Sequence, residues 1–148
     1  MRFVDTNILL YTASTAPEEE NKAHIARNLL DARDLTLSVQ VLQEFYVQAT
    51  RPGKSGRLSH REAVQLIEAF LRFPVQEITV PVMRAALDAR DRFQISYWDA
   101  AIIEAARAAG CKTILSENTD ATRSCACKKD VINNAAAKKI FFIPGCIF

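Results

Sequence analysis

Short apolar stretches alternate along the chain with longer segments of helical periodicity. In the strand-like stretches the apolar residues either form a short run, as at Phe3-Val4, or alternate with polar residues, as at residues 35–39. In the helical segments they recur every three or four residues. The predicted strands are residues 3–5, 35–39, 75–80 and 112–116. Alternating strands and helices are typical of an α/β fold, in which helices cover both faces of a parallel sheet.

Residues typical of helix ends mark several boundaries. Ser59 with Glu62, and Ser96 with Asp99, have the spacing of a capping box at a helix start. The predicted helices are one that contains residues 8–11, then residues 25–34, 41–49, 63–72 and 81–92, and one that Ser96 opens and Gly110 ends. Residues 140–143, before Pro144, have the composition of an edge strand.

Composition narrows the class of protein. The chain has 148 residues, of which 49% are hydrophobic and 24% charged, as expected for one domain spanning residues 1–148. Its apolar runs are shorter than the roughly 20 residues that a membrane-spanning helix needs, and its first residues do not resemble a secretory signal. We therefore expect a soluble cytoplasmic protein without a membrane partner, whose four Cys are free thiols.

Charge and cysteine content change abruptly near residue 118. Residues 1–117 carry 14 Lys and Arg against 15 Asp and Glu, whereas residues 118–148 carry five Lys and Arg against two Asp. Three of the four Cys also lie in the second segment, two of them as Cys125-Ala-Cys127. This pair lacks further ligands at the spacing of a structural zinc site, so zinc is disfavoured.

Several acidic residues fall where the carboxyl ends of the predicted strands meet. Asp5 ends the first strand, while Glu117 follows the last, with Asp120 three residues further on. Glu44 and Asp99 lie on helices next to apolar stripes, which would turn both side chains toward the protein. Ligands of open parallel sheets bind at this edge. Carboxylates held close together repel one another, so the cluster indicates a hard divalent cation such as Mg²⁺ or Mn²⁺.

Each acid also has a simpler interpretation. Asp99 has the position of a capping-box partner, and a lone Glu44 is typical of a solvated helix surface. Asp5 stands directly after a buried strand and before Thr-Asn, which favours a functional role. The combination carries more weight than any single member.

The same residues resemble the PIN-domain ribonucleases, especially the VapC toxins of VapBC toxin–antitoxin pairs. The likeness covers about residues 1–117 and lies in the order and spacing of four segments. They read Phe-Val-Asp5-Thr-Asn7, Gln43-Glu44-Phe45, Tyr97-Trp98-Asp99-Ala100-Ala101-Ile102 and Thr113-Ile114-Leu115-Ser116-Glu117.

This resemblance implies a three-layer α/β/α sandwich with a mainly parallel sheet, and metal-dependent cleavage of single-stranded or loop RNA. Asp5, Glu44 and Asp99 would be the catalytic acids that hold Mg²⁺ or Mn²⁺, with Asn7 and Ser116 as polar supports. Cleavage would leave a 5′-phosphate and a 3′-hydroxyl. The implied partners are an RNA substrate, a small antitoxin that occupies the acidic groove, and a second copy in a homodimer.

The fourth acidic position departs from the family pattern. Relatives closest to this pattern have Ser-Glu-Asp after the last parallel strand, whereas this chain has Ser116-Glu117-Asn118. Asn118 supplies a neutral oxygen, so metal binding would be weaker unless Asp120 reaches the ion. The departure coincides with the composition break. We hypothesise that residues 118–148 come from a shifted reading frame or a replaced C-terminus, which translation of the neighbouring frame would test.

Two other functions remain open. A homologue that only binds antitoxin or RNA would keep the fold but lack metal affinity and cleavage. A phosphatase of the haloacid-dehalogenase type also has an Asp after its first strand. That chemistry needs a second acid two residues later, where this chain has Asn7, so this alternative is disfavoured.

Two further signals concern RNA. The loop with Arg51, Lys54 and Arg57 could bind RNA phosphates or be an ordinary solvated loop. Trp98 could stack on a base, although its place at a helix start beside Asp99 favours packing in the core.

Overall fold

We analysed a computed structural model that describes residues 1–53 and 56–117, and the backbone of residues 140–142. Its centre is a five-stranded sheet with the spatial order β3-β2-β1-β4-β5. The strands are β1 (Arg2–Val4), β2 (Leu35–Ser38), β3 (Val75–Gln76), β4 (Thr113–Leu115) and β5 (Ile140–Phe142). Strands β1 to β4 pair in parallel, and β5 pairs antiparallel with β4 at one edge. The predicted edge strand is thereby confirmed.

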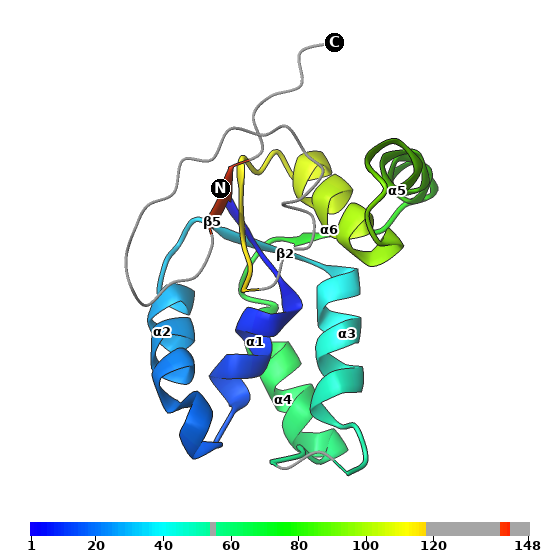
Figure 1. Cartoon of the computed structure of the whole chain (residues 1–148). Helices are drawn as coiled ribbons and strands as arrows, with labels where there is room; N and C mark the ends of the chain where they lie inside the picture. The colour runs from blue at the N-terminus through cyan, green and yellow to red at the C-terminus, as the bar shows by residue number, and fades with distance from the viewer. Residues whose placement is uncertain (54–55, 118–139, 143–148) are drawn as a thin grey trace.

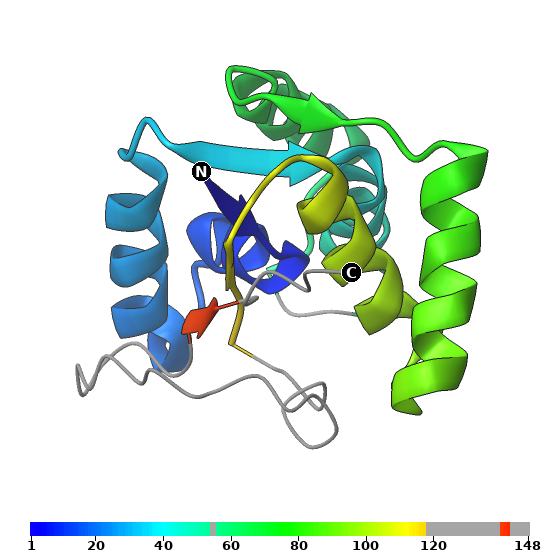
Figure 2. The same cartoon turned by 90° about the horizontal axis from the view of Figure 1, so that it is seen from above.

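Helices lie on both sides of this sheet. They are α1 (Thr6–Ala13), α2 (Glu20–Leu30), α3 (Val39–Ala49), α4 (His60–Phe70), α5 (Val80–Phe93) and α6 (Tyr97–Ala108), with a 3-10 turn at Pro17–Glu19. Helix α6 covers one side with α5 packed on its outer surface, whereas α1 and α2 lie on the other (Figures 1 and 2). The predicted α/β class, with its mainly parallel sheet between helices, is confirmed.

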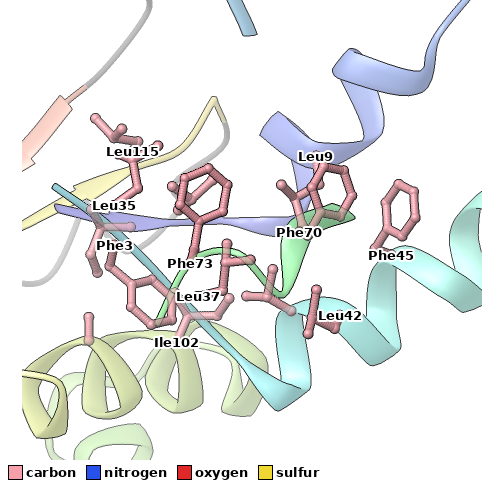
Figure 3. Packing of buried hydrophobic residues seen from close by; sticks show 14 of the residues in the cluster. Phe3, Leu9, Leu35, Leu37, Leu42, Phe45, Phe70, Phe73, Ile102 and Leu115 are labelled. Carbon is pink, nitrogen blue, oxygen red and sulfur yellow. The ribbon is translucent and has the colours of Figure 1, made fainter. Parts of the chain in front are cut away.

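The core fills the space between the sheet and its helices (Figure 3). All four residues of β2 are buried, as expected for a strand covered on both faces. On the side of α3 and α4, Phe45 meets Phe70 edge to face, with 5.3 Å between ring centroids. Between α5 and α6 the buried residues are alanines, whose small side chains let the two helices approach closely.

The predicted strand at residues 75–80 is wrong in its second half. Strand β3 ends at Gln76, and Val80 is already the first residue of α5. Thr79 caps that helix with its hydroxyl, and Pro81 lies in the first turn, where a missing N–H costs nothing. The end signals of the helix therefore outweighed the alternating apolar pattern.

The order of the strands determines where a ligand would bind. The chain runs outward from β1 through β2 to β3 and returns on the other side of β1 as β4. The carboxyl ends of β1 and β4 therefore flank the topological switch point of the sheet, the usual binding position in open α/β folds.

Some predictions fall outside the described residues. These concern Lys54, Asn118, Asp120 and the Cys125-Ala-Cys127 pair. Cys111, which is described, is a buried free thiol, as predicted. Within the described part of the chain, no helix is long and apolar enough to cross a membrane.

Candidate active site

Asp5 joins the first strand to the first helix. Its N–H donates to the carbonyl of Leu115 (3.0 Å), which continues the contact between β1 and β4 by one residue. Its carboxylate caps α1, because Oδ1 accepts a hydrogen bond from the N–H of Thr6 (2.7 Å). The other oxygen, Oδ2, accepts from the hydroxyl of Ser116. The carboxylate is thus held at the switch point between β1 and β4.

Asn7 and Ser116 fasten this turn to the end of β4. The side-chain amide of Asn7 donates to Oγ of Ser116 (3.1 Å), and its oxygen accepts from the N–H of Glu117 (3.3 Å). Ser116 is buried and in turn donates to Asp5. Asn7 therefore helps to orient the hydroxyl that binds the Asp5 carboxylate.

Glu44 reaches the same edge from the second turn of α3. This helix begins directly after β2, where Ser38 caps it. Oε2 of Glu44 accepts from the hydroxyl of Thr6 (2.9 Å), and Oε1 accepts from the side-chain amide of Gln40 (3.0 Å) one turn earlier. Thr6 and Gln40 are both buried. Because Thr6 is the neighbour of Asp5, one short segment of α1 contacts both carboxylates.

Asp99 lies in the first turn of α6. Ser96 caps this helix by accepting from the N–H of Asp99 (3.1 Å), and its hydroxyl donates to Oδ2 of the same residue (2.8 Å). In α4 the equivalent Glu62 also accepts from the backbone N–H of its cap, Ser59 (2.8 Å). Both carboxylates accept from the hydroxyl of their cap (2.7 Å from Ser59 to Glu62), so Asp99 differs in that it does not also bind the backbone N–H of its cap.

The three carboxylates interact electrostatically. Burial is the largest effect that raises the pKa of Asp5, and the negative charges of Glu44 and Asp99 raise it further. Hydrogen bonds from Ser116 and Thr6 act in the opposite direction. In the part of the chain that the structure describes, no Lys or Arg forms an ion pair with any of these three acids. Among the described residues, the negative charge of this site therefore has no paired cation.

The chemistry of this donor set suits a hard divalent cation. Carboxylate oxygens are the ligands that Mg²⁺ and Mn²⁺ prefer, and Mg²⁺ often takes only one or two of them and keeps several waters. Among residues 1–53 and 56–117, no three His, Cys, Asp or Glu side chains lie close enough to hold one ion together. An ion at Asp5 would therefore take one or two direct carboxylate ligands from these described residues.

Comparison with known proteins identifies the family. The sequence matches the PIN domain family over residues 2–125. The chain belongs to the PIN-domain family. The predicted resemblance to the PIN-domain family is confirmed by this match, and the structural neighbours described next share its fold.

Solved structures share the fold of this PIN domain. VapC20 of Mycobacterium tuberculosis, described as a toxin that cleaves the sarcin–ricin loop, is 22% identical (TM-score 0.65; 82% of this chain and 93% of that chain covered). A toxin–antitoxin complex from Klebsiella pneumoniae is 18% identical, with a TM-score of 0.63 and coverage of 85% of this chain and 93% of that chain. VapBC2 of Rickettsia felis, bound to a promoter DNA fragment, is 16% identical, with a TM-score of 0.58 and coverage of 82% of this chain and 90% of that chain. No curated protein matches the sequence significantly.

Glu117 of the PIN domain is paired outside the three-acid cluster. It forms an ion pair with Lys22 (2.7 Å) and accepts a hydrogen bond from the Tyr11 hydroxyl. Lys22 also lies over the ring of Tyr11, 4.9 Å from its centroid. Glu117 therefore connects the end of β4 to α1 and α2.

The basic loop is remote from the carboxylates along α3. Arg51 and Arg57 are exposed in the connection between α3 and α4. Arg51 lies about 10 Å from Glu44 along the axis of α3, because each helical residue adds a rise of roughly 1.5 Å. The loop does not complete the acidic cluster, and its contact with RNA stays a prediction.

Trp98 is 61% exposed, so the interpretation that it packs in the core is wrong. Fully buried positions on α6 begin at Ala100, whereas in the first turn Tyr97 and Asp99 are half-buried and Trp98 between them is exposed. Which side of this first turn faces the core depends on how α6 packs against its neighbours, and the sequence alone does not reveal that packing.

Two residues that hold the site were not singled out from the sequence. Thr6 stands within the Asp5-Thr-Asn7 segment, but nothing in the pattern shows that its hydroxyl would reach α3. Gln40 precedes Glu44 by one helical turn, and this spacing is the signal that could have identified it.

Proposed function

We propose that this PIN domain is a divalent-metal-dependent endoribonuclease that acts in the cytoplasm as the toxin of a type II toxin–antitoxin pair. The observation that carries the proposal is the uncompensated negative charge at Asp5, whose pKa the charges of Glu44 and Asp99 raise. Membership of the PIN-domain family supports nuclease chemistry. The toxin role is supported by structural neighbours that are described as toxins or toxin–antitoxin complexes.

In this proposal Asp5, Glu44 and Asp99 hold Mg²⁺ or Mn²⁺, either directly or through water. When bound, the ion would activate water for attack and offset negative charge on the phosphate. Ser116 and Asn7 orient the Asp5 carboxylate, while Thr6 and Gln40 donate hydrogen bonds to Glu44. Such supporting hydrogen bonds fix the direction of ligand lone pairs.

The proposed partners follow from the same comparison. A small antitoxin would cover the acidic edge and block access of RNA, in keeping with the toxin–antitoxin complexes among the structural neighbours. A homodimer is also proposed. Arg51, Lys54 and Arg57 remain candidates for contacts with RNA phosphates away from the cut.

A second candidate is a PIN homologue that binds antitoxin or RNA without cleaving. Asn118, where relatives have an acid, favours it, because the site then has one negative charge fewer. Affinity for Mn²⁺ separates the two candidates, since an active site binds the ion and cleaves, whereas a degenerate site does neither.

The test is cleavage of a mixed RNA substrate that includes tRNA, with Mn²⁺ or with EDTA. The proposal predicts metal-dependent cutting that leaves 5′-phosphates. Asp5→Asn keeps the size of the side chain but removes its charge, so its rate should fall by about 100-fold or more. The matched control is Asp88→Asn, which alters an exposed acid on α5 and should cut like the wild type.

Equal cutting by wild type and Asp5→Asn would contradict the proposed site. Folded wild-type protein that cuts no RNA with any divalent ion would contradict the nuclease and favour the second candidate. Circular dichroism of each variant verifies that a lost activity is not a lost fold.

A further inference from the structure

Trp98 is an exposed aromatic residue that the proposed catalytic machinery does not use. It is the single Trp of the chain, and 61% of its surface is accessible. The other large apolar side chains that are exposed in the described part of the chain are aliphatic or Met. Trp side chains are highly buried on average, so one left open beside a candidate active site requires an explanation.

The indole packs against one neighbouring aromatic ring. Its ring meets that of Tyr97 at 69°, with 5.4 Å between the centroids. Tyr97 is half-buried and packs on the alanine cluster that joins α5 to α6. Trp98 is therefore an aromatic surface anchored at one side and open to solvent on most of the rest.

Trp98 also stands next to a member of the acidic cluster. It directly precedes Asp99, and consecutive Cα atoms are about 3.8 Å apart. Neighbouring residues on a helix point roughly 100° apart, so the indole and the carboxylate can contact different parts of one ligand. A ligand that suits both the indole and the carboxylate has a flat aromatic group beside an anionic group. A cation can then bridge the anionic group to the carboxylate. A nucleotide has this chemistry.

We propose that Trp98 stacks on an unpaired nucleobase of the RNA next to the phosphate that is cleaved. This inference rests on the proposed function, and it names a residue through which the enzyme would select its RNA substrate. A base within a duplex has both faces covered by its neighbours, whereas a base in a loop or a single strand can place one face on the indole. The PIN domain would therefore select unpaired nucleotides through Trp98 independently of their sequence.

Binding can be measured directly because Trp98 is the only indole fluorophore. The measurement uses the full chain carrying Asp5→Asn, so that RNA is not consumed. The probes are a short oligouridylate and an abasic ribose-phosphate chain of the same length. The oligouridylate should quench Trp98 fluorescence at saturation, and the abasic chain should leave it nearly unchanged, because only the first has a base that can stack.

Substitutions test the contribution of the aromatic face. In the same background, Trp98→Leu keeps apolar bulk and should weaken binding of labelled oligouridylate by at least about fivefold, whereas Trp98→Phe should keep most of the affinity. Binding of the abasic chain should not change. Leu87→Ala alters another exposed apolar residue, on α5, and should leave both affinities unchanged.

Three results would overturn the inference. They are equal quenching by the two chains, unchanged oligouridylate affinity in Trp98→Leu, and Trp98 fluorescence that depends on protein concentration alone, which would place the residue in contact with a second copy. Cleavage by the wild type is measured separately. If the wild type cuts RNA and Trp98→Leu binds normally, the stacking inference fails while the proposed function stands.

Discussion

Asp5 combines a structural and a chemical role in one side chain. Its carboxylate caps α1 and accepts from Ser116, yet it lies close to two other negative charges. Capping favours the ionised form, whereas burial and the charges of Glu44 and Asp99 oppose it, and the net effect is a raised pKa. Without a cation, the charged form of Asp5 therefore destabilises the fold.

This balance predicts how stability depends on pH in EDTA. The folded protein binds the Asp5 proton more tightly than the unfolded chain, so stability declines as pH rises from about 3.9, the ordinary Asp value, through the raised pKa. Asp5→Asn lacks this decline. Its Tm advantage over the wild type should grow across that range and then level off, as thermal denaturation can measure. An advantage that shrinks with rising pH would show that the ionised carboxylate is net stabilising.

Thr6 contributes to the site through a single hydroxyl. Thr6→Val removes the hydrogen bond to Glu44 and leaves the shape of the buried side chain nearly unchanged. We expect affinity for Mn²⁺ to fall by roughly 10-fold, as for other groups that orient ligands, in a calorimetric titration. Thr12→Val is the control on the same helix, since the Thr12 hydroxyl bonds only to the carbonyl of Leu9. Equal affinities in the two variants would remove Thr6 from the site.

At the scale of elements, helix starts position the carboxylates. Helix α1 starts after Asp5 and α3 after Ser38, each directly at the carboxyl end of a strand, while α6 starts after Ser96. Polar cap residues determine where each helix begins, and the helix period then determines which residue faces the shared edge. Glu44 and Asp99 reach one region because of these start points.

Two serine caps provide a matched test of this idea. Ser96→Ala and Ser59→Ala each remove a helix cap and should lower stability by about 1 kcal/mol. Only Ser96 also binds the carboxylate of a site residue, Asp99. We therefore expect Ser96→Ala alone to weaken Mn²⁺ binding and RNA cleavage. Similar losses of metal affinity in both variants would mean that general stability, rather than the orientation of Asp99, is responsible.

Local patterns were sufficient to predict most elements and the acids at their ends. The apolar run before Asp5 and the apolar stripes beside Glu44 and Asp99 place these residues at one sheet edge. The contact of Thr6 with Glu44 was not predictable, because it depends on how α1 packs against α3. The exposure of Trp98 depends likewise on which side of the first turn of α6 faces the core. The hydrophobic periodicity of a sequence does not reveal how elements pack against one another.

At the scale of the whole molecule, strand order brings the site together. Strands β1 and β4 are neighbours in space although most of the described chain separates them, and the switch point lies between their carboxyl ends. Beyond β4, the antiparallel pairing of β5 shows that the basic C-terminal segment contributes an edge strand to the sheet. Its origin in a shifted frame stays a prediction, as does the role of Asn118 and Asp120.

The central claim is that Asp5, Glu44 and Asp99 form one divalent-cation site. The most direct measurement is calorimetric titration of the full chain with Mn²⁺, beside Asp5→Asn, Glu44→Gln and Asp99→Asn. Glu68→Gln, at an exposed acid on α4, is the control. The account predicts a saturable site in the wild type and in Glu68→Gln that each of the other three substitutions weakens. A wild type that binds no Mn²⁺, or three variants that bind it as tightly as the control, would contradict the claim.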